Sequence, residues 1–130
     1  MAVRFGTLLR NTILNNIISS LGASAAQLKI YTGTQPASAE DAATGTLLVT
    51  ITTIGWNAAA GGSADITGTK TGTAVATGTA GWARLSNTGD TQRIDGSVGT
   101  TGTDFIIDNT SISSGGVVAL TSALLTQAAS

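Results

Sequence analysis

The triplet Thr-Gly-Thr occurs six times in this chain, beginning at positions 32, 44, 67, 71, 77 and 101. Threonine is β-branched and suits the half-exposed surface of a strand, whereas glycine supplies the bends between strands. The triplets are irregularly spaced, which argues against a regular Thr-rich solenoid of the ice-binding kind. The repeat therefore predicts many short strands joined by turns.

Small residues dominate the composition, with 23 Thr, 20 Ala, 17 Gly and 12 Ser making up 72 of the 130 residues. Charged residues account for only 10% of the chain and the formal net charge is -1, whereas a typical soluble domain has about 25% charged residues. So few ions predict that partner subunits cover part of the surface, which indicates a component of an assembly. The alternative is a low-charge monomer.

The length fits one compact domain. We assign residues 1–26 to an N-terminal arm and amphipathic helix, and residues 27–130 to a single β domain. Cysteine is absent, so disulfides and thiolate metal sites are excluded. Stability must therefore come from packing, strand pairing and oligomerisation.

Residues 7–22 have the pattern of an amphipathic helix, with apolar residues at spacings of three and four. These residues are Leu9, Ile13, Leu14, Ile17, Ile18 and Leu21. We expect Thr7 to be the N-cap and Gly22 the C′ residue that ends the helix. The alternative is a secretory signal ending near residues 23–25, although Asn and Ser residues interrupt its apolar run. No stretch approaches the ~20 apolar residues of a membrane span, so no membrane partner is expected.

From Leu28 onward the period changes to two, which is typical of strands. Strands are expected at 28–31, 46–54, 73–85, 92–98, 104–108 and 117–126. Gly78 and Gly81 should bend the long strand, and a turn at 87–90 should make it a hairpin with 92–98. Residues 32–45, which contain Pro36, are expected as a loop and 55–62 as a flexible connection. These six strands, or seven if the long one divides at its bends, indicate a mainly β fold, an antiparallel β-sandwich or jelly roll with one N-terminal α-helix.

Residue types that carry catalysis are nearly absent. Without histidine or cysteine there is no imidazole acid or base and no thiolate nucleophile, so we expect the protein not to be an enzyme. The seven carboxylates match no calcium-binding loop, and the glycines form no phosphate-binding motif, so neither metal nor cofactor is expected. Six basic residues form no positive stripe, which argues against nucleic-acid binding.

Three aromatic residues, Tyr31, Trp56 and Trp82, have two interpretations. If exposed together, they would form a sugar-stacking platform. In a core of mainly small residues, they are more readily explained as volume fillers or as part of a subunit interface. Trp82 and Arg84 are two apart in one strand, so they should share a face and make a cation–π or interface contact.

Several segments carry a resemblance to a known class of protein. They are 28–38 (LKIYTGTQPAS), 45–48 (GTLL), 78–85 (GTAGWARL), 95–100 (DGSVGT) and 109–115 (NTSISSG), which follow the N-terminal helix. In these segments the chain resembles small proteins encoded in the head-gene region of tailed bacteriophages. The resemblance extends over most of the chain. The resemblance implies a virion protein of the capsid decoration or cement type with a β-sandwich or jelly-roll body. Such a protein is made in the host cytoplasm, resides on the capsid surface and brings no catalytic residues.

The expected partners are therefore a major capsid protein and further copies of the chain, as a dimer or trimer. A subunit that binds only the assembled shell stabilises that shell by linkage. The residues expected to contact partners are Arg4, Phe5, Leu8, Leu9, Arg10, Trp82 and Arg84. Two alternatives remain open: another phage structural part, such as a tail or head-to-tail connector protein, and a carbohydrate-binding or adhesin-like module.

Overall fold

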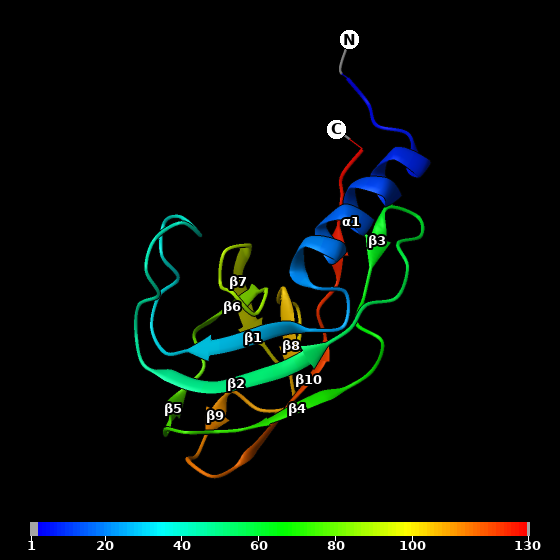
Figure 1. Cartoon of the computed structure of the whole chain (residues 1–130). Helices are drawn as coiled ribbons and strands as arrows, with labels where there is room; N and C mark the ends of the chain where they lie inside the picture. Colours follow the sequence, from blue (N-terminus) through cyan, green and yellow to red (C-terminus); the bar gives the residue numbers. More distant parts are fainter. Residues whose placement is uncertain (1–2, 130) are drawn as a thin grey trace.

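The computed structural model describes residues 3–129 (Figure 1). Within that range it holds one helix, α1 (Thr7–Leu21), and eleven strands. The strands are β1 (Ala26–Tyr31), β2 (Leu47–Ile54), β3 (Ser63–Ala64), β4 (Lys70–Thr73), β5 (Gly78–Thr79), β6 (Trp82–Ser86), β7 (Arg93–Gly99), β8 (Phe105–Ile107), β9 (Ser111–Ile112), β10 (Val117–Ser122) and β11 (Leu125–Thr126). Over residues 3–129, no helix combines the length and the apolar character needed to cross a bilayer.

Seven strands form one sheet in the order β2-β1-β6-β7-β8-β10-β4. Neighbouring strands are antiparallel except β7 and β8, which run parallel. The two outer strands approach each other: Val75, just after β4, donates its N–H to the Leu48 carbonyl of β2 at 2.8 Å. Further along, a Cβ on Gly72 would lie 2.6 Å from the Thr50 carbonyl. The sheet is therefore nearly closed and barrel-like, which confirms the expected mainly β fold with one N-terminal helix (Figure 1).

Side chains from all parts of the sheet fill the interior. The largest fully buried ones are Trp82, Phe105, Leu14, Leu21, Leu28, Ile30, Leu48, Ile51, Ile54, Leu85, Ile107 and Leu120. In β2 the expected alternation is only partial, because Leu48, Val49 and Ile51 are all fully buried. Leu48 is covered from the β5 side, where a Cβ on Gly78 would lie 3.1 Å from Leu48 Cδ2.

Helix α1 attaches to the barrel through its second half, where Leu14, Ile18 and Leu21 are buried. Its asparagines hold the chain that follows β2. Asn15 Oδ1 accepts a hydrogen bond from the Ala59 N–H at 3.1 Å, and Asn11 Oδ1 accepts one from Gly62 at 2.9 Å. The polar residues that interrupt the apolar run therefore bind the 55–62 connection to the helix.

The ends of α1 agree only partly with expectation. Gly22 ends the helix in the left-handed conformation with φ of 105°, as predicted. The prediction of Thr7 as N-cap is wrong by one residue, since Gly6 is the N-cap and Thr7 begins the helix. The Thr7 hydroxyl instead accepts a hydrogen bond from Arg10 Nη2 at 3.0 Å, so it is used within the first turn.

The predicted strand 73–85 is divided into the end of β4, the short β5 and β6. The strand is interrupted next to Gly78 and at Gly81, where bends were expected. A Cβ on Gly78 would lie 2.9 Å from Thr32 Cγ2, and one on Gly81 would overlap the Gly33 backbone. The segment therefore bends to let residues 32–33 pass close beside it. Beyond Ser86 the hairpin forms as predicted, with β6 and β7 antiparallel and Trp82 opposite Ser97.

Candidate interaction surfaces

Trp82, Arg84 and Asp95 form a buried cluster on β6 and β7. The Arg84 guanidinium makes a two-pronged ion pair with the Asp95 carboxylate, at 2.7 Å from Nε and 2.9 Å from Nη2. Its carbon Cζ lies 5.4 Å from the centre of the Trp82 ring, a cation–π distance. Tyr31 of β1 stacks on Trp82 with ring centres 4.8 Å apart. The predicted shared face and cation–π contact of Trp82 and Arg84 are confirmed, within a single chain.

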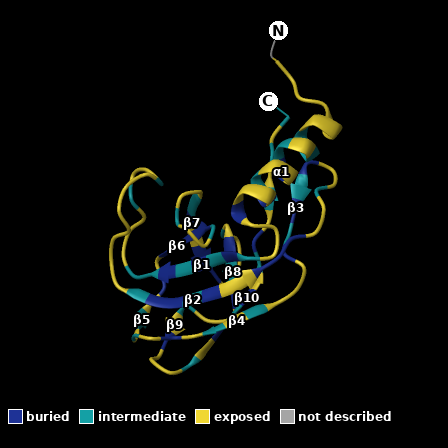
Figure 2. Ribbon diagram, viewed as in Figure 1, coloured by how far each residue is buried: buried dark blue, intermediate teal, exposed yellow. Residues whose placement is uncertain are grey.

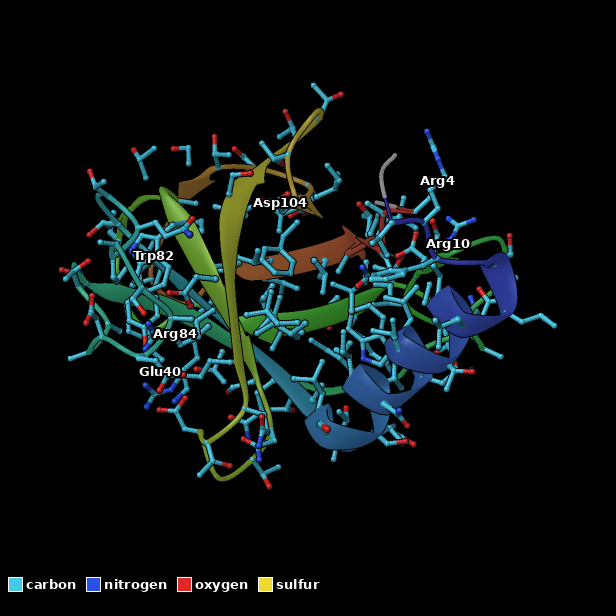
Figure 3. The ribbon with its side chains drawn as sticks, turned by 90° about the horizontal axis from the view of Figure 1, so that it is seen from above. Arg4, Arg10, Glu40, Trp82, Arg84 and Asp104 are labelled. Atoms are coloured by element: carbon cyan, nitrogen blue, oxygen red, sulfur yellow. The ribbon has the colours of Figure 1, made fainter. Side chains whose placement is uncertain are left out.

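This cluster holds residues 32–46, which we call the covering loop. Arg84 Nη2 donates to the Asp41 carbonyl at 2.9 Å, and Trp82 Nε1 donates to the Thr44 carbonyl at 3.3 Å. Arg93, at the start of β7, donates to the carbonyl of Glu40 at 3.3 Å. Trp82 and Arg84 are only 1% and 3% exposed as a result. Neither side chain offers a surface to a partner while the covering loop is in place (Figure 3).

The cluster also perturbs ionisation. Hydrogen bonding to Asp95 raises the pKa of the Arg84 guanidinium, which is therefore charged at every working pH. On the hairpin turn, hydrogen bonds from Arg93 lower the pKa of the Asp90 carboxyl. Its folded pKa is below the unfolded one, so the contribution of this pair to stability is present above pH ~4 and is lost as pH falls.

The single tyrosine reports on this region. Burial against Trp82 raises the pKa of the Tyr31 phenol, because the anion is disfavoured there. Absorbance titration of the native protein should give a midpoint above the ordinary value of about 10, and denaturant should return it to about 10. Since the folded pKa is the higher one, stability should be intact below pH ~10 and fall as the pH rises further. A Tyr31→Phe variant should lose this part of the alkaline dependence, and equal midpoints with and without denaturant would contradict the burial.

The N-terminal residues present a different surface. Val3, Phe5, Leu8 and Leu9 are 77%, 36%, 83% and 52% exposed, and we call these four side chains the N-terminal surface. Figure 2 shows the arm and the first turns of α1 as exposed, in contrast to the buried end of the helix. Three of the predicted contact residues, Phe5, Leu8 and Leu9, are thus placed together at this end of the molecule.

The two predicted arginines of this region differ in their surroundings. Arg4 is exposed beside the apolar side chains. Arg10 is partly buried, with Nη1 placed 3.5 Å from the Gln127 carbonyl, and it helps to join α1 to the C-terminal segment. In residues 3–129 the two ion pairs both lie on the β6–β7 hairpin. Neither Arg4 nor Arg10 therefore has a carboxylate partner within that range.

The aromatic residues expected to form a sugar-stacking platform are mostly buried. Trp56 is 8% exposed and Trp82 is 1% exposed, which leaves only Tyr31 with partial access. A glycan-stacking site needs open aromatic faces, so this arrangement favours the volume-filling interpretation.

Sites for chemistry are sparse in the described chain. Among residues 3–129, no three carboxylates come close enough together to hold a metal ion. Two of the hollows flank β7. One, of about 380 Å³, is lined by four apolar and four polar residues, namely Ile13, Ile17, Leu21, Ile94, Asn16, Ser20, Gln92 and Arg93. The other, of about 340 Å³, includes Ile94, Asp95, Asp104 and Leu124.

Comparisons with known proteins give no match: no family model, no curated protein and no solved structure is similar to this chain at a significant level.

The sequence pointed to Trp82 and Arg84, but not to the other groups that fasten the covering loop. Asp95 lies in turn-rich sequence and looks like an ordinary turn carboxylate, although it lies opposite Arg84 in the hairpin register. That register was predictable from the turn at 87–90, so the pairing was accessible from sequence. The carbonyl groups of Glu40, Asp41 and Thr44 were not, because backbone acceptors leave no trace in the side-chain pattern.

Proposed function

We propose that this chain is a structural virion protein, a cement or decoration subunit that stabilises a phage head by bridging capsomers. The observation that carries the proposal is the N-terminal surface. Of seven large apolar side chains exposed in residues 3–129, four lie within residues 3–9. Soluble monomers rarely leave such a group uncovered, whereas interaction sites commonly contain one. The low charge of the chain supports the same conclusion.

The proposal includes the partners and the body plan implied by the resemblance to phage head proteins. The N-terminal surface meets a major capsid protein, further copies of the chain, or both. The barrel-like body is proposed to be the counterpart of the sandwich or jelly roll of such proteins. The body is one seven-stranded sheet in the order β2-β1-β6-β7-β8-β10-β4, in which β7 and β8 run parallel.

A double variant tests the apolar anchor. Leu8→Ser with Leu9→Ser removes two exposed side chains from the first turn of α1. Each apolar side chain buried at an interface contributes about 1.5–3 kcal/mol, so affinity for empty phage heads should fall at least about a hundredfold. Co-sedimentation with empty heads of the encoding phage, over a protein concentration series, measures this loss.

The control is Val75→Ser with Val117→Ser, which removes two equally apolar side chains that are 67% and 66% exposed but lie outside the N-terminal surface. It should bind heads as well as the unmodified protein. Saturation at a number of copies that matches the capsid symmetry supports a cement subunit. Failure of the unmodified protein to sediment with heads, or a ring of copies confined to the neck, would overturn the proposal.

A further inference from the structure

An open hollow beside β7 is lined by both apolar and polar side chains. Its lining comes from β7, from the start of β8 and from the C-terminal side, and consists of Ile94, Asp95, Asp104, Phe105, Leu124, Leu125 and Thr126. The volume is about 340 Å³, and Leu124 is 54% exposed. We call it the β7 hollow.

A carboxylate is fixed at the same place. Asp104 lines the hollow, and its Oδ2 accepts hydrogen bonds from the N–H of Ser97 at 2.9 Å and from the Ser97 hydroxyl at 3.0 Å. Both bonds hold the carboxylate in position, but neither neutralises its charge. The two ion pairs among residues 3–129 lie elsewhere, so within that range the charge has no cationic partner. The β7 hollow thus combines apolar side chains with one unneutralised negative charge, because Asp95, the other carboxylate of the lining, is paired with Arg84.

The N-terminal arm has the complementary features. Residues 3–5 read Val-Arg-Phe, in which Val3 is 77% exposed and Arg4 is also exposed. No acidic residue occurs in the first 39 positions of the chain, so Arg4 has no local counter-charge. The arm therefore presents apolar side chains on either side of a free cation.

Arm and hollow lie beside the same C-terminal segment. The Phe5 N–H donates to the Ala129 carbonyl at 2.6 Å, while residues 124–126 line the hollow. In Figure 3, seen from above, Arg4 and Asp104 lie toward the same edge of the view, while Figure 1 places the N-terminal arm above the sheet. Two copies related by a two-fold axis can then each offer an arm to the hollow of the other, which makes a closed, self-complementary interface.

We propose that residues 3–5 of one copy dock in the β7 hollow of a second copy, and that the two arms exchange reciprocally to form a dimer. Arg4 pairs with Asp104 of the second copy, and the flanking Val3 and Phe5 cover Leu124. With a volume of about 340 Å³, the hollow is large enough for the Phe5 ring, since a cavity of about 150 Å³ holds benzene. Because the exchange is reciprocal, every contact occurs twice. A short arm needs this doubling, since stable interfaces bury about 1,200–2,000 Å² in total.

This dimer does not depend on the phage-head proposal and leaves Leu8 and Leu9 free for a shell. Loss of head binding in the Leu8 and Leu9 variant, with the dimer intact, would separate the two surfaces. A protein that dimerises but never binds heads would overturn the proposed function alone.

Mixed cross-linking tests the docking. The chain has no cysteine, so a Val3→Cys protein mixed with a Leu124→Cys protein can form a mixed disulfide only between copies. Under mild oxidation the mixture should yield at least about tenfold more mixed dimer than Val3→Cys with Val75→Cys, because docked thiols meet at a high effective concentration. Equal yields, or preferential linkage to position 75, would overturn the proposal.

Light scattering over a concentration series tests the charge pair. Arg4→Gln and Asp104→Asn should each weaken dimerisation about tenfold, and the double variant should be no weaker than either single one. The amide introduced by Asp104→Asn still has an oxygen to accept from Ser97, so the β7–β8 connection is kept. A monomer at all concentrations, or fully additive effects of the two substitutions, would exclude the proposed pairing.

Discussion

Replacing Arg84 with methionine is expected to lower the free energy of unfolding by about 3–5 kcal/mol, the usual cost of removing one partner from a buried ion pair. The substitution leaves the Asp95 carboxylate, whose side chain is 4% exposed, without its cation. It also removes the hydrogen bond to the Asp41 carbonyl and the charge beside Trp82. Equilibrium denaturation in urea, followed by tryptophan fluorescence, measures the change.

Arg93→Met is the matched control, because it breaks the other ion pair of the same hairpin. The Arg93 and Asp90 side chains are 25% and 44% exposed, so water compensates for most of the loss, and the expected cost is at most about 1 kcal/mol. An Arg84→Met, Asp95→Leu double variant should recover much of the stability lost in Arg84→Met, since it leaves no buried charge. Equal costs for Arg84→Met and Arg93→Met would show that the Arg84 pair is not buried.

The Arg84→Met variant should also release the covering loop. Arg84 and Trp82 hold its backbone at Asp41 and Thr44, and no helix or strand is formed between residues 32 and 46. Loss of the Arg84 bond therefore converts a fixed segment into one that opens locally at lower cost. Opening would expose Trp82, so this cluster makes the loop part of the folded body and keeps an aromatic surface away from solvent.

The Trp82 and Arg84 cluster illustrates what the sequence predicts and where it stops. Periodicity placed both residues on one face of a strand, and the turn at 87–90 fixed the hairpin, so their mutual contact was predictable. Their burial was not, because it depends on a loop whose contacting residues lie 38 and 43 positions earlier in the chain. The expected partner was therefore another subunit, whereas the structure supplies a segment of the same chain.

Helix α1 shows a similar division. The spacing of apolar residues identified the buried face at Leu14, Ile18 and Leu21. Leu9 belongs to the same pattern but is 52% exposed, because the barrel contacts only the second half of the helix. Sequence pattern reveals which residues share a face but not how far a neighbour extends along it. The exposed Leu9 is thus a product of the tertiary arrangement, and it contributes to the surface on which the proposed function depends.

Barrel closure can be tested with one methyl group. Gly72→Ala places a Cβ 2.6 Å from the Thr50 carbonyl oxygen and 3.0 Å from side-chain carbons of Val49 and Ile51. The atom nearest to the new Cβ belongs to the backbone. A change of side-chain rotamer therefore cannot relieve the clash, and β2 and β4 must move apart. The expected loss of unfolding free energy is about 2–3 kcal/mol, the upper part of the range for overpacked sites. Thermal and urea denaturation measure it.

Gly68→Ala is the control with the same chemistry, because a Cβ at Gly68 meets nothing within 4 Å. That variant should be neutral or more stable by up to about 1 kcal/mol, since alanine restricts the unfolded chain. A neutral Gly72→Ala variant would mean that β4 does not lie against β2, and that the sheet is open along this edge. An open edge would present unpaired backbone groups and would itself be a surface for strand pairing between copies. The size of this one difference therefore shows whether the proposed association has a second possible route along the sheet edge, besides the N-terminal surface.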